Sequence, residues 1–256
     1  MEQPGGYGKV YHKRLHDPCK VRAAVFDDGQ RRVALVGVDA LMVPRTLVDG
    51  VRMAIHMKCG IAPGAVLIGA SHSHSSGPTG MVQPRQFDDA PPIVQKLAYE
   101  LSSCANEQYL VHVGQQLVAA VCDAASSLRD ARCGFGVGIE DKVAFNRRFR
   151  MKNGLTWTHP GKGNPDIVEP AGPADPEVGV IGTWDNGGKL MGCVVNFACH
   201  ATTSPGGISA NYIHYLEQTV RGVFGSDTVV VFLAGACGDV TPVSYTHLTL
   251  PTNREV

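Results

Sequence analysis

The sequence has no apolar segment of the roughly 18 residues that a membrane-spanning helix requires. Its charges balance to a formal net charge of zero with a pI near 7.1, so it lacks the basic surface that binds nucleic acid or anionic membranes. The first residues, Met1–Gly8, lack the charged and apolar regions of a signal peptide. With 44% hydrophobic residues in 256, the chain can bury the core of one large domain or most of one. We therefore expect a soluble chain with no nucleic-acid partner and no transmembrane segment.

The cysteines lack the C-x-x-C spacing of a zinc ribbon and do not form a disulfide pattern. They stand singly in apolar or small-residue surroundings, where cysteine packs as a small hydrophobic residue. The eight positions are Cys19, Cys59, Cys104, Cys122, Cys133, Cys193, Cys199 and Cys237. The sequence therefore predicts buried free thiols.

The segment Ser71–Pro78 (SHSHSSGP) directly follows a strand-like apolar run, Val66–Ala70. Side chains alternate along an extended chain, so His72 and His74 project to the same side. Neutral imidazole is a common zinc ligand, and a pair at the end of a strand leaves room for a third ligand and a water. A lone H-x-H segment is also compatible with a polar loop, so the metal-site interpretation needs further donors.

Two later apolar runs also end in polar or glycine-rich segments. Lys189–Ala198 is followed by Cys199 and His200, and Thr228–Ala234 is followed by Gly235–Pro242. Ligands bind at the carboxyl ends of strands in open α/β sheets. His200 is therefore the natural third candidate for a metal site at that edge.

Three of these segments, in this order, resemble the signature motifs of the neutral/alkaline (non-lysosomal) ceramidase family. Ser71–Pro78 is similar to the family's T-H-T-H-S-G-P segment, Asn196–Thr202 to N-F-x-x-H-x-T, and Gly238–Pro242 to G-D-x-S-P. Further similarity lies in His16–Gly29, in Val33–Asp39 and in Asn146–Arg148. The resemblance covers nearly the whole chain and is specific for the superfamily, although not for ceramide as the substrate.

The resemblance implies a zinc-dependent hydrolase of the amide bond of an N-acyl lipid, such as ceramide, with a metal-activated water as nucleophile. It implies that His72 and His200 bind Zn²⁺ and that His74, beside the metal, orients ligand or substrate. Arg147 would polarise the scissile carbonyl. Thr241 stands where the family has a serine proposed as nucleophile or substrate contact. Because a branched Cβ restricts its rotamers, we expect Thr241 to position substrate rather than to form an acyl-enzyme.

The resemblance also bears on the extent of the chain and on its location. The family's remaining zinc ligands, a glutamate and a tyrosine, lie well beyond the G-D-x-S-P segment, so further protein ligands are expected from a missing C-terminal part. We expect residues 1–243 to be a partial catalytic domain, inactive by itself, and residues 244–256, with His247, to be a non-native read-through tail. The family resemblance suggests a secreted or periplasmic protein.

The pattern of apolar residues predicts an α/β fold with a mixed β-sheet flanked by helices on both faces. We expect Asn153–Pro176, rich in glycine and proline, to be a surface loop over the site. The expected strands are 32–38, 66–70, 133–139, 178–184, 189–198 and 228–234, and the expected helices are 46–58, 93–128 with a break near 104–106, and 208–224.

Two other functions remain open at this point. The first is an H-x-H metal hydrolase of the amidohydrolase barrel type, although the hairpin expected at 178–198 disfavours eight uniform βα units. The second is an inactive fragment that acts as a binding module. Cys199 and Asp239 are alternative metal ligands, and Asp39 is either a hydrogen-bond partner of a histidine or a loop cap.

Overall fold

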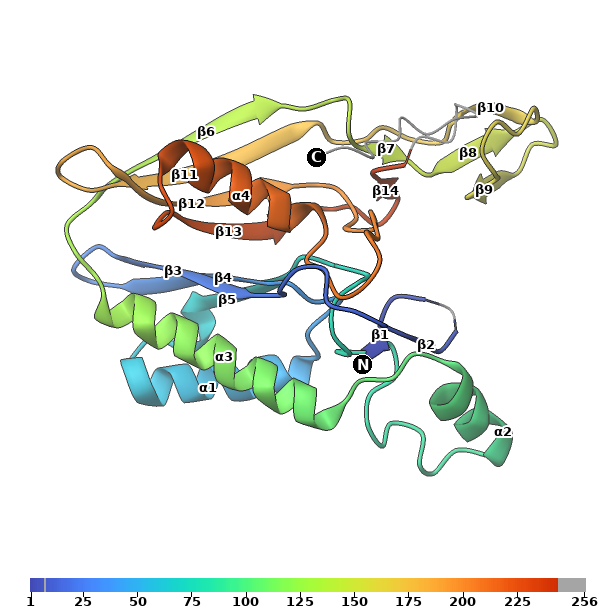
Figure 1. Ribbon diagram of the computed structural model, residues 1–256, viewed down its shortest axis with the longest axis horizontal. Helices are drawn as coiled ribbons and strands as arrows, with labels where there is room; N and C mark the ends of the chain where they lie inside the picture. The colour runs from blue at the N-terminus through green and yellow to red at the C-terminus, as the bar shows by residue number, and fades with distance from the viewer. Residues whose placement is uncertain (7, 244–256) are drawn as a thin grey trace.

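The computed structural model describes residues 1–6 and 8–243, and the expected tail 244–256, with His247, lies outside the described residues. Two β-sheets lie between two layers of helices (Figure 1). The first sheet has the order β3-β4-β5, and the second has the order β13-β12-β11-β6. The strands are β3 (Val21–Asp27), β4 (Arg32–Val38), β5 (Val66–Ala70), β6 (Arg132–Ile139), β11 (Glu177–Trp184), β12 (Leu190–Phe197) and β13 (Val229–Ala234).

The sequence-based expectation of a mixed α/β fold is confirmed, with the strands divided over two sheets. In each sheet one pair is parallel, β4 with β5 and β12 with β13, and the other pairs are antiparallel. The sheets approach closely at Gly37, where an added Cβ would lie 2.5 Å from the carbonyl oxygen of Phe232. No closed β/α barrel forms in the described residues, so the amidohydrolase alternative is excluded.

Helices α1 (Arg45–Cys59) and α3 (Glu107–Ser126) cover the first sheet, and α4 (Tyr212–Phe224) covers the second (Figure 1). The predicted break in the second helical segment is present. A short helix, α2 (Pro92–Gln95), continues into a π-helical turn, and α3 starts only after Asn106, whose side chain accepts a hydrogen bond from the Tyr109 amide. Each helical layer buries its own apolar cluster against the sheet beneath it.

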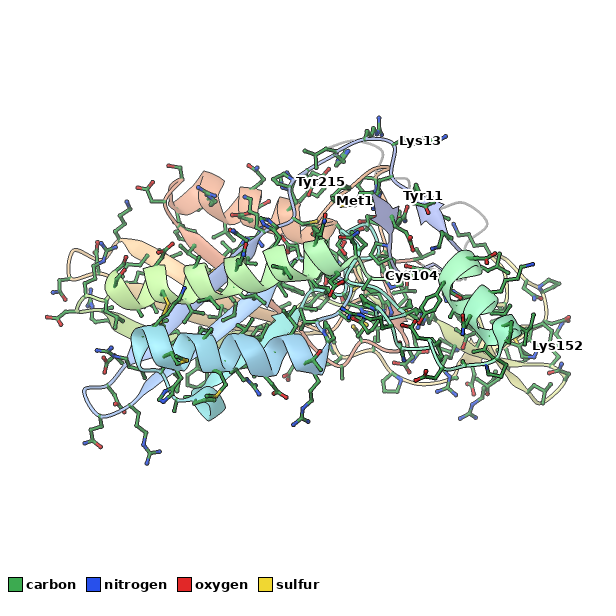
Figure 2. The ribbon with its side chains drawn as sticks, turned by 90° about the horizontal axis from the view of Figure 1, so that it is seen from below. Met1, Tyr11, Lys13, Cys104, Lys152 and Tyr215 are labelled. Atoms are coloured by element: carbon green, nitrogen blue, oxygen red, sulfur yellow. A yellow bond between two sulfur atoms is a disulfide. The ribbon has the colours of Figure 1, made fainter. Side chains whose placement is uncertain are left out.

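The expected surface loop at 153–176 is wrong in part, because it contains two strands. β9 (Thr156–Thr158) and β10 (Ile167–Pro170) flank β8 (Arg148–Met151) in a small antiparallel sheet. Two further pairs join β1 (Glu2–Gln3) to β2 (Val10–Tyr11) and β7 (Phe145–Asn146) to β14 (Val240–Thr241). Figure 2 shows Tyr11 of β2 and Lys152, in the turn between β8 and β9, toward the same end of the molecule. No helix among the described residues is long and apolar enough to cross a membrane.

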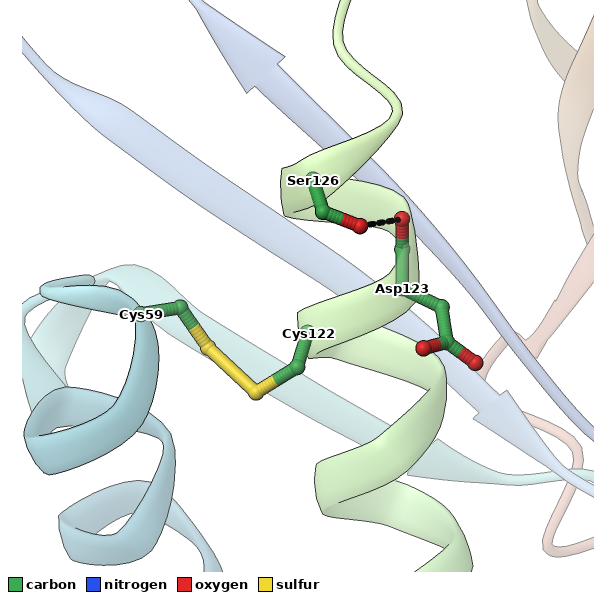
Figure 3. Close-up of a disulfide and its surroundings, with 4 residues drawn as sticks. All are labelled: Cys59, Cys122, Asp123 and Ser126. Atoms are coloured by element: carbon green, nitrogen blue, oxygen red, sulfur yellow. Dashed lines mark hydrogen bonds between the residues drawn. A yellow bond between two sulfur atoms is a disulfide. The ribbon is translucent and has the colours of Figure 1, made fainter.

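A disulfide joins Cys59, the last residue of α1, to Cys122 in the last turns of α3 (Figure 3). The expectation of free thiols at these two positions is therefore wrong. Sequence spacing gave no indication of the pair, because it depends on two helices that lie side by side on the first sheet. The other six cysteines are free.

Removing this disulfide is expected to destabilise the fold. It closes a loop with a sequence separation of 63 residues, and the chain-entropy relation for such a loop gives about 4 kcal/mol. The double variant Cys59→Ser, Cys122→Ser should unfold at a clearly lower urea concentration, whereas Cys133→Ser, at an exposed free thiol, should not. Equal midpoints for the wild type and the double variant would mean that the bond contributes nothing in solution.

Candidate metal centre

Two loops carry the three histidines, and backbone hydrogen bonds join the loops. The first loop follows β5, where the amide of Ser73 donates to Ala40 at 3.1 Å. The second follows β12, and Ser73 pairs with Ala201 in an isolated parallel bridge. The amide of His74 donates to the Ala201 carbonyl at 3.1 Å. These contacts connect the carboxyl ends of two strands that belong to different sheets.

His72, His74 and His200 form one cluster at this junction. One potential ligand atom from each residue can be chosen so that all three lie within 4.8 Å of one another. The Nε2 atoms of His72 and His74 are 3.2 Å apart. Two ligands in a tetrahedral site with zinc–nitrogen bonds of about 2.0–2.1 Å would be about 3.3 Å apart. The spacing of this pair therefore suits a shared metal ion.

Backbone carbonyls fix the orientation of two of the rings. His72 Nδ1 lies 2.8 Å from the Leu41 carbonyl oxygen, and His200 Nδ1 lies 2.6 Å from that of Cys237 and 3.0 Å from that of Val240. A carbonyl only accepts hydrogen bonds, so each Nδ1 carries the proton and each Nε2 keeps its lone pair. Partners of this kind orient metal-binding histidines in known sites. They also choose the tautomer in which Nε2 can bind the metal.

Two of the three imidazoles, those of His74 and His200, are held in the neutral form that binds metal. Burial, followed by the nearby His72 and His200, lowers the pKa of His74 to about 4, although a backbone hydrogen bond with Gly5 opposes the shift. Burial is also the first cause that lowers the pKa of His200, followed by His72 and Arg147. Metal therefore meets little competition from protons near neutral pH.

The lowered pKa of His74 should make the stability of the metal-free protein depend on pH. An unfolded histidine titrates near 6.5, so between about pH 6.5 and about pH 4 the unfolded chain binds more protons than the folded one. The free energy of unfolding should therefore fall as the pH is lowered through this window. Urea unfolding measured with a metal chelator present should show that the free energy of unfolding falls less steeply with decreasing pH for His74→Gln than for the wild type. The same pH dependence of the free energy of unfolding in both proteins would contradict the low pKa of His74.

Arg147 lies between β7 and β8, and its positive charge acts on the histidine cluster. It contributes to lowering the pKa values of His74 and His200. Its Nη2 donates to the Gly238 carbonyl at 2.6 Å, and its Nη1 is 3.3 Å from His159 Nε2. Its Nε atom is buried without a hydrogen-bond partner among the described residues. Arg147 thus brings a positive charge beside the cluster.

Thr241 is buried in β14, directly after Val240, whose carbonyl contacts His200. In β14 it pairs with Phe145 of β7. Asp239, a suspected ligand, accepts instead from the Asn146 side chain at 3.0 Å. The Gly238–Pro242 segment thus contacts His200 through the backbone carbonyl of Val240.

The other suspected residues also have partners outside the cluster. Asp39 binds Arg22 at 2.8 Å and the Lys20 amide at 2.9 Å, so it caps the loop rather than contacting a histidine. Cys199 directs its sulfur to the His200 carbonyl, and burial raises the pKa of its thiol to about 12. Its sulfur therefore contacts the backbone and is not part of the three-histidine cluster.

Several residues that support the cluster could not be predicted from the sequence. The carbonyl groups of Leu41 and Cys237 act through the backbone, which carries no residue-type signal. Ser73 and Asn211 form a buried hydrogen bond of 2.7 Å behind the histidines. These contacts depend on tertiary structure, so motif spacing alone does not predict them.

The fold is similar to that of two solved structures. The crystal structure of neutral ceramidase from Pseudomonas aeruginosa aligns with 98% of this chain at a TM-score of 0.70 and 20% identity. The fold is neutral ceramidase-like. A second structure, a ceramidase complexed with C2, aligns with 87% of the chain at a TM-score of 0.62 and 21% identity. No protein-family model and no curated protein matches.

The chain spans only part of these ceramidases. It covers 38% of the length of the Pseudomonas aeruginosa protein and 33% of the second. The likeness extends over both sheets and both histidine loops, because nearly the whole of this chain aligns with the first of them. A neutral ceramidase-like fold and a three-histidine cluster that could hold a metal ion are therefore the findings that a functional assignment must explain.

Proposed function

We propose that this chain is the metal-binding part of a zinc-dependent amide hydrolase whose substrate is an N-acyl lipid of the ceramide type. The observation that carries the proposal is the cluster of His72, His74 and His200, with the tautomers of two rings set for metal binding. The neutral ceramidase-like fold supports the choice of reaction and of substrate class. Zinc is proposed because three nitrogen ligands and one open position are typical of its catalytic sites.

All three imidazoles are proposed as ligands in this chain. The resemblance to ceramidases gave His74 a substrate-orienting role, with a glutamate and a tyrosine from further along a longer chain as the remaining ligands. The distance of 3.2 Å between the Nε2 atoms of His72 and His74 favours direct binding by His74 instead. Three ligands would let residues 1–243, the proposed partial catalytic domain, hold zinc without the additional donors.

The chemistry follows from the groups around the cluster. A zinc ion held there would lower the pKa of a bound water toward about 7 and polarise an amide carbonyl. Arg147 would stabilise the negative charge that develops on the carbonyl oxygen through the positive charge of its guanidinium group. Thr241 would orient the substrate. The disulfide supports a secreted or periplasmic location, because such bonds persist in oxidising compartments.

Thr241→Ala should lower turnover by no more than about tenfold, because one positioning hydrogen bond contributes about 0.5–1.5 kcal/mol. Loss of a nucleophile would cost orders of magnitude more. The assay is hydrolysis of an N-acyl lipid by the longest natural form of the protein, with mass spectrometry for an acylated chain. An acyl group trapped on Thr241 would reject the water mechanism in favour of a covalent one.

Zinc uptake and hydrolysis together test the proposed function. The wild type should bind one zinc ion per chain, and the longest natural form should release a fatty acid from an N-acyl lipid. Zinc binding without hydrolysis would favour the alternative of a binding module. Failure of the wild type to bind zinc would reject the metal-dependent mechanism.

A further inference from the structure

Ser73 separates the two histidines of the first loop and contributes to a buried polar cluster behind them. Ser73, Ser209 and Asn211 are all fully buried, with 0% of each residue exposed. Buried polar groups of this kind are expensive unless every one of them is hydrogen-bonded. Their contacts therefore constrain the structure more than an exposed serine or asparagine would.

The hydrogen bonds define which atom donates and which accepts. Ser73 Oγ donates to the Ser209 carbonyl at 2.8 Å, so its lone pairs accept from Asn211 Nδ2 at 2.7 Å. Asn211 Oδ1 accepts from the Ser204 amide at 2.9 Å and from Thr203 Oγ1 at 2.8 Å. Because a backbone amide only donates, the Ser204 contact fixes the orientation of the Asn211 amide group.

One side chain thus spans the two loops that carry the histidines. The nitrogen of Asn211 holds Ser73, which lies between His72 and His74, and its oxygen holds Thr203 and Ser204, which follow His200. The loops belong to different sheets, so their separation depends on contacts made outside the sheets themselves. The side chain of Asn211 supplies three such contacts, one to the first loop and two to the second.

Asn211 is itself held firmly at the start of α4. Its amide donates to Ser209 Oγ at 2.9 Å, and that hydroxyl is hydrogen-bonded to the buried Asp17. The next residue, Tyr212, donates its hydroxyl to the Cys199 carbonyl at 2.9 Å, directly before His200. Asn211 also adopts a φ of 59° with a ψ of −145°, outside the left-handed helical well and in a region that residues other than glycine rarely enter. These contacts begin the helix at Tyr212 rather than at the expected residue 208.

We propose that Asn211 is a positioning residue that sets the separation of the two histidine loops and thereby the metal affinity of the cluster. The inference rests on the proposed function, because it requires that the histidines bind zinc. Asn211 does not touch the metal in this scheme. It acts through Ser73 on His72 and His74, and through Thr203 and Ser204 on the loop that carries His200.

The test compares zinc dissociation constants, measured by competition with a chromophoric chelator, for Asn211→Gly, Ser73→Ala and the double variant. Glycine keeps the positive φ and introduces no charge near the cluster. Each single variant should weaken zinc binding about 10–100-fold, as loss of outer hydrogen-bond partners does in known sites. The double variant should be little worse than either single one, because both remove the same link.

A control separates positioning from general destabilisation. The double variant Cys59→Ser, Cys122→Ser lowers stability far from the histidines, and it should bind zinc as tightly as the wild type. Unchanged zinc affinity in a folded Asn211→Gly or Ser73→Ala variant would overturn the inference, as would fully additive effects in the double variant. If the wild type itself binds no zinc, the proposed function fails instead, so the two failures are distinguishable.

Discussion

Replacing His72 with alanine is expected to raise the zinc dissociation constant by about 100-fold or more and to abolish hydrolysis. Structural zinc sites bind with about 10–16 kcal/mol shared among four ligands, which gives roughly 3 kcal/mol for each ligand. His74→Ala and His200→Ala should have effects of the same size, because their ring nitrogens belong to the same cluster. Zinc titration of the three variants in the chain described here measures the effect directly.

His112 provides a matched control for these substitutions. It is exposed on α3, outside the cluster, so His112→Ala should bind zinc as the wild type does. If His72→Ala and His200→Ala bind zinc weakly but His74→Ala binds it as the wild type does, His74 has the substrate-orienting role that the family resemblance implies. Wild-type affinity in His72→Ala or His200→Ala would show that the cluster is not the zinc site.

Replacing Arg147 with methionine should lower turnover by about 100–1,000-fold, the range observed when one donor to a developing oxyanion is removed. Zinc affinity should be unchanged or slightly higher, because the positive charge of Arg147 lowers the pKa values of His74 and His200 and opposes a bound cation. The measurement is hydrolysis of an N-acyl lipid at saturating zinc by the longest natural form of the protein, together with a zinc titration.

The neighbouring Arg148 is the control for this prediction. It is exposed at the start of β8, and, unlike Arg147, it is not among the charges that shift the pKa values of His74 and His200. Arg148→Met should therefore retain nearly full turnover. Equal losses in the two variants would indicate a general effect of charge, and a loss of zinc binding in Arg147→Met would indicate a structural role for its contact with Gly238.

The sequence predicts the donors of the site better than their arrangement. The i, i+2 spacing of His72 and His74 after an apolar run, together with the similar setting of His200, identifies the three residues that the structure brings together. Strand ends are recognisable because apolar residues give way abruptly to glycine and polar residues. These signals are local, so they can be recognised in the sequence without knowledge of how the strands are arranged.

The remaining features depend on contacts between distant segments. The division of the strands into two sheets requires the close approach of Gly37 and Phe232, and the disulfide requires that α1 and α3 lie side by side. The hydrogen bonds of Asn211 join segments that no periodicity connects. Residue spacing within one segment cannot predict such pairings.

X-ray absorption at the zinc edge, measured on the metal-loaded wild-type chain, tests the proposed centre most directly. The spectrum should show three imidazole nitrogens and one further light-atom ligand, with zinc–nitrogen distances of about 2.0–2.1 Å. Imidazole scattering should decrease by one ligand in His74→Ala. A sulfur ligand at about 2.3 Å, or only two imidazoles in the wild type, would contradict a three-histidine site.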